Sequence, residues 1–471
     1  MARDSVSPAI DAVPPPRLRR GRIARALLGW MMLTGIQHAD AADTGLSADT
    51  ITSEGVLVLG GAGGTFVGQN VATINADGSN RTTITSSGNS HPSWTPDGRI
   101  IFVSIRSGDP EIWLMEQDGS NAHQVGNLTG YSPATPQMAR NGLIAFLGTT
   151  MEGSTSLITM RSDGTGLRTV PLPSGMDLQS FSVSPSGDWI VFSNQTQNPY
   201  HRELWRVNID GTGLRQLTFP TNADYPDANA PSISPDGTQI AFFYGLAADP
   251  VDGVSQSRLT WGHRNIAVMS ADGGAITIVT NCQPVTTQAQ LDALTSSDCI
   301  MGDNPSWSPH GGWIVYDRAS GTDSDTSLVR ADGEDAQILL PYGRGNVRVA
   351  LQLALLRVSG TLDLGGTTVT LNGGLLLSGG KVLNGTLTSN GTFSLRAGTV
   401  SAILDGGGFV IKTTDGTVTL SGANTYSGGT YVLDGVLALS GAGTLGAASG
   451  LTNVSGGTLD LGGTTQIQNG G

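Results

Sequence analysis

PSISPDGTQIAFFY, residues 231–244, is the stretch that decides the fold. Pro235 fixes φ for a turn and Gly237 accepts the positive φ of a tight turn, so we expect strand, turn and strand. The apolar run from Ile240 to Phe243 is too short and too aromatic for a helix. One hairpin cannot bury its apolar face alone, so the chain needs further hairpins of the same kind.

Such hairpins recur along the chain. Copies lie at residues 92–103 (PSWTPDGRIIFV), 181–192 (FSVSPSGDWIVF) and 305–316 (PSWSPHGGWIVY), with a divergent copy at 134–146. Each copy is followed by an apolar strand that ends in Asp-Gly, among the strongest hairpin signals. The Asp-Gly pairs, including one before the first copy, lie 41, 45, 47, 62 and 60 residues apart and begin at Asp77, Asp118, Asp163, Asp210, Asp272 and Asp332.

A period near forty residues with four short strands per unit is typical of a β-propeller blade. The six Asp-Gly hairpins therefore predict an all-β fold with six blades. The first blade has no PSWSPDG copy of its own, so we expect its inner strand from residues 49–53 or 346–353. Tryptophans recur at matching blade positions, which predicts packing between blades; they are Trp94, Trp113, Trp205 and Trp307.

The pattern PSWSPDG…IAF…I-x-VM-x-x-DG resembles the β-propeller repeat of the TolB family over about residues 55–342. The resemblance implies a TolB-like propeller, which we place at residues 50–344. It implies a fold more strongly than a function, because propellers serve as binding modules and as enzymes.

The composition indicates an acidic exported protein. Charged residues are only 13% of the chain, the net charge is −13, and Gly contributes 67 residues. Phosphates would be repelled, so nucleic acid is not an expected partner. Residues 1–41 resemble a signal peptide: five arginines between Arg17 and Arg25, an apolar core at 26–36 and the cleavage signal Ala39-Asp40-Ala41. We expect no transmembrane span in the mature chain, because that core is too short.

After Gly343 the sequence becomes rich in Gly-Gly, Thr, Leu and Ser. Residues 356–374, LRVSGTLDLGGTTVTLNGG, are echoed at 452–471, TNVSGGTLDLGGTTQIQNGG. Short alternating strands between glycine corners predict a Gly-rich β-solenoid over residues 345–471, whose coils bury a continuous apolar column.

Residues 406–446 resemble the autotransporter-associated β-strand repeat, chiefly through GTVTLSGANTYSGGTYV. The resemblance implies a right-handed β-helix of the kind found in passengers, ahead of a membrane barrel. No run of amphipathic ten-residue strands typical of a barrel follows. Two interpretations stay open: the chain is a fragment, or the solenoid stands without a translocator.

Two insertions are the predicted functional loops. The one at residues 245–264 is a candidate partner-contact loop with Asp249, Asp252, Arg258, Trp261 and His263. Long loops on a rigid scaffold often carry function. The insertion at 281–303 holds both cysteines, Cys282 and Cys299. In an exported protein we expect them to form a disulfide rather than two free thiols.

We find no catalytic motif, no metal motif and no cofactor motif. There is no G-x-S-x-G elbow, H-E-x-x-H or C-x-x-C pair. The leading hypothesis is a non-enzymatic exported protein, at the cell surface or in the periplasm, whose propeller binds a protein or surface glycan. Alternatives are a periplasmic TolB-like scaffold for envelope proteins and a propeller-based metal-dependent sugar lyase. A His–carboxylate site assembled across the channel and the oligomeric state stay open.

Overall fold

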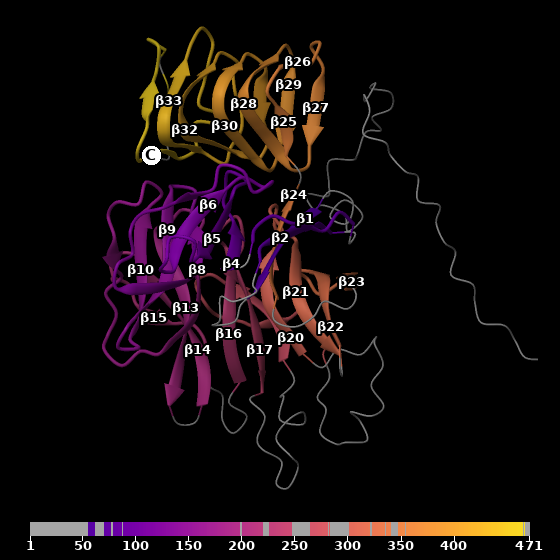
Figure 1. Cartoon of the computed structure of the whole chain (residues 1–471). Helices are drawn as coiled ribbons and strands as arrows, with labels where there is room; N and C mark the ends of the chain where they lie inside the picture. Colours follow the sequence, from indigo (N-terminus) through magenta and orange to yellow (C-terminus); the bar gives the residue numbers. More distant parts are fainter. Residues whose placement is uncertain are drawn as a thin grey trace, which may run out of the picture. The chain divides into compact units, whose positions relative to one another are not determined.

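A computed structural model gives the architecture, and every element in its described residues is a β-strand (Figure 1). The described residues are 55–61, 70–76, 79–86, 88–197, 200–219, 226–246, 264–280, 282, 301–320, 323–334, 336–340, 347–353, 355–464 and 466. Residues 45–471 form one compact unit.

Six four-stranded antiparallel blades make up the propeller, as the Asp-Gly spacing predicts. In blades 2 to 6 the first strand in chain order is innermost and the fourth outermost. Blade 2 comprises β4 (Asn89–Trp94), β5 (Ile100–Ser104), β6 (Glu111–Met115) and β7 (His123–Gln124). Blade 3 comprises β8 (Tyr131–Met138), β9 (Leu143–Thr150), β10 (Thr155–Arg161) and β11 (Arg168–Thr169). Blade 4 comprises β12 (Leu178–Val183), β13 (Trp189–Gln197), β14 (Tyr200–Asn208) and β15 (Arg215–Gln216). Blade 5 comprises β16 (Pro226–Ile233), β17 (Gln239–Leu246), β18 (Arg264–Ser270) and β19 (Thr277–Ile278). Blade 6 comprises β20 (Met301–Trp307), β21 (Trp313–Ser320), β22 (Asp323–Arg330) and β23 (Gln337–Leu340).

Blade 1 closes the ring with strands from two distant parts of the chain. It consists of β1 (Gly55–Gly61), β2 (Ala72–Asn75), β3 (Thr82–Thr83) and β24 (Val347–Leu353), in the order β24-β1-β2-β3. β24 pairs antiparallel with β1, from Gly55↔Leu353 to Gly61↔Val347. The second of the two predicted donors is therefore the correct one. The last propeller strand lies beyond residue 344, because the change of composition precedes the closing strand.

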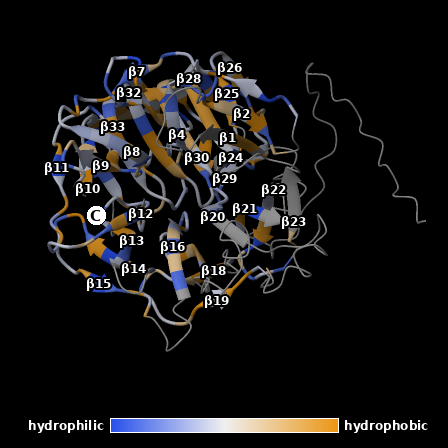
Figure 2. Ribbon diagram, turned by 60° about the horizontal axis from the view of Figure 1, so that its bottom comes forward, coloured by the Kyte–Doolittle hydropathy of each residue, from blue (hydrophilic) through white to orange (hydrophobic). Residues whose placement is uncertain are grey.

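The apolar cores lie between neighbouring blades. One cluster joins Ile101 of blade 2 to Phe146 of blade 3, and another joins Leu204 of blade 4 to Phe242 of blade 5. All four side chains are almost completely buried. Burying a side chain of this size stabilises the fold by about 1.5–3 kcal/mol. Figure 2 shows apolar residues along strands such as β13. Because each of these two clusters is shared by two neighbouring blades, a blade depends on its neighbour to bury its apolar face.

The C-terminal part is a parallel β-solenoid, as predicted (Figure 1). Its strands are β25 (Leu356–Val358), β26 (Thr361–Asp363), β27 (Thr368–Leu371), β28 (Gly374–Leu383), β29 (Thr386–Ser389), β30 (Thr392–Val400), β31 (Ile403–Asp405), β32 (Phe409–Leu420), β33 (Thr430–Leu439), β34 (Thr452–Val454) and β35 (Thr458–Asp460). Equivalent residues stack from coil to coil, so an inward-facing position forms a ladder: Val358, Leu377, Leu395, Lys412, Val432 and Val454.

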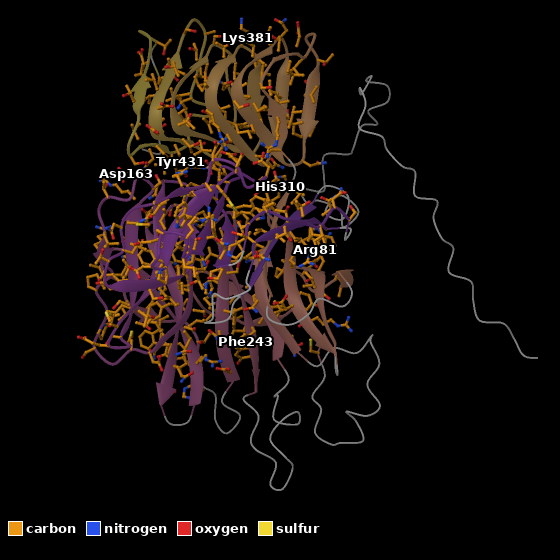
Figure 3. The ribbon with its side chains drawn as sticks, in the orientation of Figure 1. Arg81, Asp163, Phe243, His310, Lys381 and Tyr431 are labelled. Atoms are coloured by element: carbon orange, nitrogen blue, oxygen red, sulfur yellow. The ribbon has the colours of Figure 1, made fainter. Side chains whose placement is uncertain are left out.

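Apolar side chains fill the column between these coils. Phe393 and Tyr426 are completely buried with their ring centroids 6.1 Å apart. The Tyr426 hydroxyl lies 2.7 Å from Thr430 Oγ1, so its polar end is satisfied. Outward-facing residues are separate from this core: Figure 3 shows Lys381 and Tyr431 on opposite sides of the solenoid.

Several side chains connect the solenoid to the propeller. Arg396 of β30 forms a 2.7 Å ion pair with Glu116, next to β6. The Arg140 guanidinium lies 4.3 Å from the ring centroid of Phe409 in β32. Ser455 Oγ donates to the Asn141 carbonyl at 3.1 Å. The contacts combine charge, aromatic and polar interactions on the PSWSPDG-type turns and the hairpins beside them.

Candidate binding site in the propeller channel

The candidate site is a cavity of about 350 Å³ at the propeller axis. Its wall consists of the inner strands of blades 2 to 6 and the turns that follow them, together with Gln352 of β24. These are the PSWSPDG-type segments, so the repeat that builds the blades also lines the channel. The solenoid residues Asn390, Thr392 and Phe409 contribute to the same cavity.

A bulge at the same point of four inner strands shapes the wall. The residue before the first proline of the repeat has a positive φ: His91 (50°), Thr135 (53°), Ala230 (49°) and Asn304 (47°). The strand register shifts at each of these positions. Proline has no N–H for the ladder, so a bulge accommodates it. The bulges interrupt the regular pairing beside the axis, and it resumes two residues later.

The turn after each inner strand is fixed by its own side chains. In blade 2, Thr95 Oγ1 donates to Asp97 Oδ1 at 2.5 Å, and Arg99 Nε donates to Asp97 Oδ2 at 2.7 Å. Burial acts to raise the pKa of Asp97, but Arg99 and Thr95 outweigh it and the pKa lies below the usual value. In blade 5, Ser234 Oγ donates to Asp236 Oδ1 at 2.6 Å. The turns are thus rigid supports for the wall.

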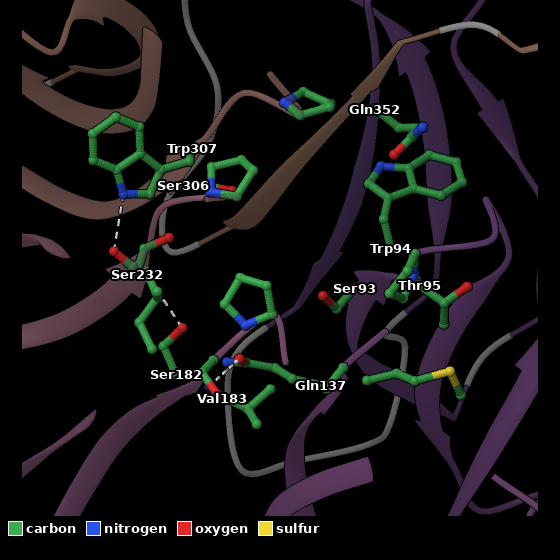
Figure 4. A pocket seen from close by; sticks show the side chains of 18 of the residues that line it. Ser93, Trp94, Thr95, Gln137, Ser182, Val183, Ser232, Ser306, Trp307 and Gln352 are labelled. Carbon is green, nitrogen blue, oxygen red and sulfur yellow. Dashed lines mark hydrogen bonds between the residues drawn. The ribbon is translucent and has the colours of Figure 1, made fainter. Parts of the chain in front are cut away.

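Hydrogen bonds join each of three successive blades to the next around the axis (Figure 4). The Val183 amide donates to Gln137 Oε1 at 3.1 Å, and the Ile233 amide donates to Ser182 Oγ at 3.2 Å. Trp307 Nε1 donates to the Ser232 carbonyl at 2.9 Å. The residues that accept these bonds all occupy the second position of the PSW-type triplet. The channel wall is therefore pre-organised.

The chemical character of the cavity is neutral and polar. Hydroxyl and amide groups come from Ser93, Thr135, Gln137, Ser182, Ser306 and Gln352, and flat apolar surfaces come from prolines, Trp94 and Trp307. Among the described lining residues, Arg140 is the one permanent charge. Burial lowers the pKa of Arg140, while Tyr431 and Asp236 act to raise it. Its Nη2 donates to the Pro235 carbonyl at 2.7 Å.

The described residues that line the cavity include no His–carboxylate pair. Ser90 Oγ lies 3.0 Å from His91 Nδ1, but Ser90 is completely buried and unavailable to a substrate. Burial lowers the pKa of His310 to about 4, so this side chain is neutral at pH 7. A His–carboxylate pair does occur, His201 Nε2 to Glu203 Oε1 at 3.0 Å, but it lies within β14 rather than across the channel.

Most site residues predicted from the insertions lie outside the described residues. These are Asp249, Asp252, Arg258, Trp261, His263 and Cys299. Cys282 is described: it is 2% exposed, and its amide donates to Asn265 Oδ1 at 2.7 Å. The partner-contact loop and the Cys282–Cys299 disulfide therefore stay predictions, as does the signal peptide at residues 1–41.

The channel itself was missed as a site. The tryptophans Trp94, Trp113, Trp205 and Trp307 all pack in or against blade cores, as predicted, and Trp94 and Trp307 also line the cavity. The signal available in the sequence was the proline that begins the triplet in blades 2, 3, 5 and 6, which requires a bulge in the inner strand next to the axis.

No group of three or more His, Cys, Asp or Glu side chains suited to a metal ion occurs among the described residues. Within the same residues, no helix has the length and apolar character needed to cross a membrane.

Comparison with known proteins identifies both repeat types. Residues 64–227 match the TolB beta propeller domain family, and residues 410–439 match the passenger-associated-transport-repeat family. A TolB homolog of Chlorobium chlorochromatii is 28% identical over 145 residues, which are 31% of this chain and 30% of that protein. An uncharacterized protein of Agrobacterium fabrum is 23% identical over 233 residues, 48% of this chain and 68% of that protein.

Among solved structures, TolB from Acinetobacter baumannii is similar with a TM-score of 0.46 and 21% identity, covering 64% of this chain and 67% of that one. The Chlorobium match spans less than a third of that relative's length. The family matches and the strand order together show that the chain combines TolB-like β-propeller repeats with an autotransporter-associated repeat on a β-solenoid.

Proposed function

We propose that the chain is an exported, non-enzymatic protein of the cell envelope that binds a protein partner at the propeller channel. The observation that carries the proposal is the channel wall. All six blades present neutral hydroxyl, amide, proline or tryptophan groups around one cavity of about 350 Å³.

Such a wall suits recognition better than catalysis. General acid–base chemistry needs a positioned titratable group near the reacting atoms, and the described lining has none beyond His91 and Arg140. Proline and indole faces contact apolar parts of a ligand, while hydroxyl and amide groups bond its polar atoms. An extended peptide segment of a partner protein has both kinds of group.

The test is site-specific photo-crosslinking. A photoreactive residue in place of Ser306, which lines the cavity, should crosslink to an envelope protein, whereas the same residue in place of Met151, which is 99% exposed, should not. Equal crosslinking at both positions contradicts the channel as the binding site. A glycan array with the same protein tests the surface-glycan alternative, and binding there with no protein crosslink overturns the proposal.

Export rests on residues 1–41 and on the two repeat families, which are consistent with the periplasm or the cell surface. We expect the precursor to shorten on export and deletion of residues 1–41 to keep it in the cytoplasm. Protease added to intact cells separates the two locations: digestion indicates the surface, and protection favours a periplasmic TolB-like scaffold. An exported protein that still carries residues 1–41 would contradict the signal peptide.

The lyase alternative has its own test. Metal analysis of the purified protein and incubation with a panel of acidic polysaccharides should give no stoichiometric metal and no turnover. Turnover that Arg140→Ala abolishes would replace the binding proposal with an enzymatic one.

A further inference from the structure

Arg140 interrupts a ring of prolines around the channel. In each of blades 2 to 6 the inner strand ends in the same tight turn, in which the glycine amide donates to a carbonyl three residues earlier. The second turn residue is proline in four of these blades: Pro96, Pro185, Pro235 and Pro309. In blade 3 the second turn residue is Arg140. All five residues line the cavity, so one cation stands among four prolines.

Contacts with three other segments hold Arg140 in place. Its amide donates to the Pro185 carbonyl of blade 4 at 3.0 Å, a bond that a proline could not form. Its Nη2 donates to the Pro235 carbonyl of blade 5 at 2.7 Å, and its guanidinium lies 4.3 Å from the ring centroid of Phe409. The side chain therefore extends from blade 3 to blade 5 along the cavity wall, and its planar group is pre-oriented.

The charge of Arg140 is not neutralised by a neighbouring carboxylate. Among the described residues, Arg202 and Arg396 each form an ion pair with an acidic side chain, whereas Arg140 forms none. Asp236 and Tyr431 act to raise the pKa of Arg140, yet burial outweighs them and lowers it. A half-buried cation without a carboxylate partner is costly in free energy, and an anion beside it would offset that cost.

The guanidinium also keeps hydrogen-bond donors for a ligand. An arginine has five N–H groups in a planar fork. Within the part of the chain that the structure describes, the Pro235 carbonyl and Tyr431 are the partners of this fork. A carboxylate matches the remaining geometry, because its two oxygens can accept two parallel N–H bonds.

We propose that Arg140 is the subsite of the channel that binds a carboxylate of the partner protein, at its C-terminus or on an acidic side chain. The inference rests on the function proposed above and names the group that the channel selects. Among the described lining residues, His91 is the one other titratable group. No second permanent cation of this wall therefore competes with Arg140 for the carboxylate.

The test uses the purified full chain and three pools of short random peptides built from neutral residues. One pool ends in a free carboxylate, the second ends in a carboxamide, and the third ends in a carboxamide but contains one Asp or Glu. Retained peptides are quantified by mass spectrometry. We expect at least one carboxylate-bearing pool to be retained roughly tenfold better than the neutral pool. The pool that is retained distinguishes a chain terminus from an acidic side chain.

Substitutions of Arg140 locate the preference. Arg140→Gln should abolish it, and Arg140→Lys, which keeps the charge without the planar fork, should retain part of it. Arg106→Gln is the matched control, because Arg106 also stacks on aromatic rings, Phe102 and Trp113, but lies outside the described cavity wall. It should bind as the wild type does. Equal melting temperatures for the Arg140→Gln variant and the wild type would show that the fold is intact.

The wild type alone can overturn the inference, through equal retention of the three pools or no retention of any. A preference that survives in Arg140→Gln also overturns it. The photo-crosslink at Ser306 separates these results from a failure of the proposed function. If the preference is absent and Ser306 still crosslinks to an envelope protein, the channel binds a partner without this subsite. Loss of both the preference and the crosslink overturns both proposals.

Discussion

The Trp307 indole donates its Nε1 proton to the Ser232 carbonyl at 2.9 Å and so joins blade 6 to blade 5 beside the channel. Trp307 is 6% exposed, so water is largely excluded from this bond. The bond is one of several by which an inner strand contacts the next around the axis. Blade contacts near the axis are therefore polar and directional, while those further out are apolar.

Trp307→Phe tests the weight of this bond, since the variant keeps an aromatic ring and leaves the Ser232 carbonyl unpaired. We expect a loss of about 1–2 kcal/mol in the free energy of unfolding by urea titration. Trp205→Phe is the control, because Trp205 Nε1 is buried with no hydrogen-bond partner among the residues that the structure describes. Equal losses for the two variants would show that ring volume, rather than the hydrogen bond, determines the effect.

Ring closure by β24 gives the second prediction. Leu353 is completely buried at the point where β24 pairs with Gly55 of β1. Leu353→Ala should lower the free energy of unfolding by about 2–4 kcal/mol and increase amide exchange in β1 more than in β28. Leu167→Ala, at a 41% exposed position, should change it by less than about 0.5 kcal/mol. Unchanged exchange in β1 would contradict closure through this strand.

The blades could be predicted because their signals are local. Each Pro-Asp-Gly or Asp-Gly turn is read from a few adjacent residues, and their spacing gives the blade number. The closing strand could only be narrowed to two donors, since residues 49–53 and 346–353 both provide a short strand and pairing over the whole chain decides between them. Composition placed the end of the propeller at residue 344, before the closing strand at residues 347–353, because composition does not show which strands pair.

The channel could not be predicted, because its lining is set by which blades become neighbours. Ser182 and Ser232 occupy the same position in two copies, yet one accepts through its hydroxyl and the other through its carbonyl. The bulges at His91 and Thr135 place the lining residues near the axis. In the sequence, the proline after each of these residues is the only indication of a bulge. The functional prediction was placed instead on the long insertions at residues 245–264 and 281–303, because long loops often carry function.

The cysteines provide the third prediction. A bridge between Cys282 and Cys299 closes a short loop, which in the chain-entropy description stabilises the fold by about 3 kcal/mol. We expect no thiol to react with an alkylating reagent under native, non-reducing conditions. Cys299→Ser should lower stability by about 2–3 kcal/mol, and the double Ser variant should match it. Full alkylation of both cysteines in the exported protein would rule out the bridge.

The ion pair between Arg396 and Glu116 gives the fourth prediction. Their side chains are 15% and 14% exposed, and Arg396 Nε and Nη2 lack hydrogen-bond partners among the described residues. Glu116→Gln should therefore cost about 3 kcal/mol, because it removes the ion-pair partner of a largely buried guanidinium. Glu116→Leu with Arg396→Leu should recover most of that loss. If the double variant is as unstable as Glu116→Gln, the loss does not come from the unpaired charge and the prediction is wrong.

Lys412 gives the last prediction, through pH. It is completely buried in the inward ladder between Leu395 and Val432, and its Nζ donates to the Asp434 carbonyl at 3.1 Å. Burial lowers the pKa of Lys412 to about 8 from 10.5, while Asp434 and Asp415 act to raise it. Between these values the unfolded chain holds a proton that the folded chain has released, so stability rises as pH increases through this window.

The rise should end near pH 10, because burial raises the pKa of Tyr426 and only the unfolded tyrosine then ionises. From about pH 8 to 10 we expect the free energy of unfolding to increase by up to ~1.4 kcal/mol per pH unit. Lys412→Met should abolish the increase, whereas Lys381→Met, at an exposed position of the same solenoid, should retain it. If both variants retain the increase, another group is responsible and the Lys412 amine is solvated in the folded protein.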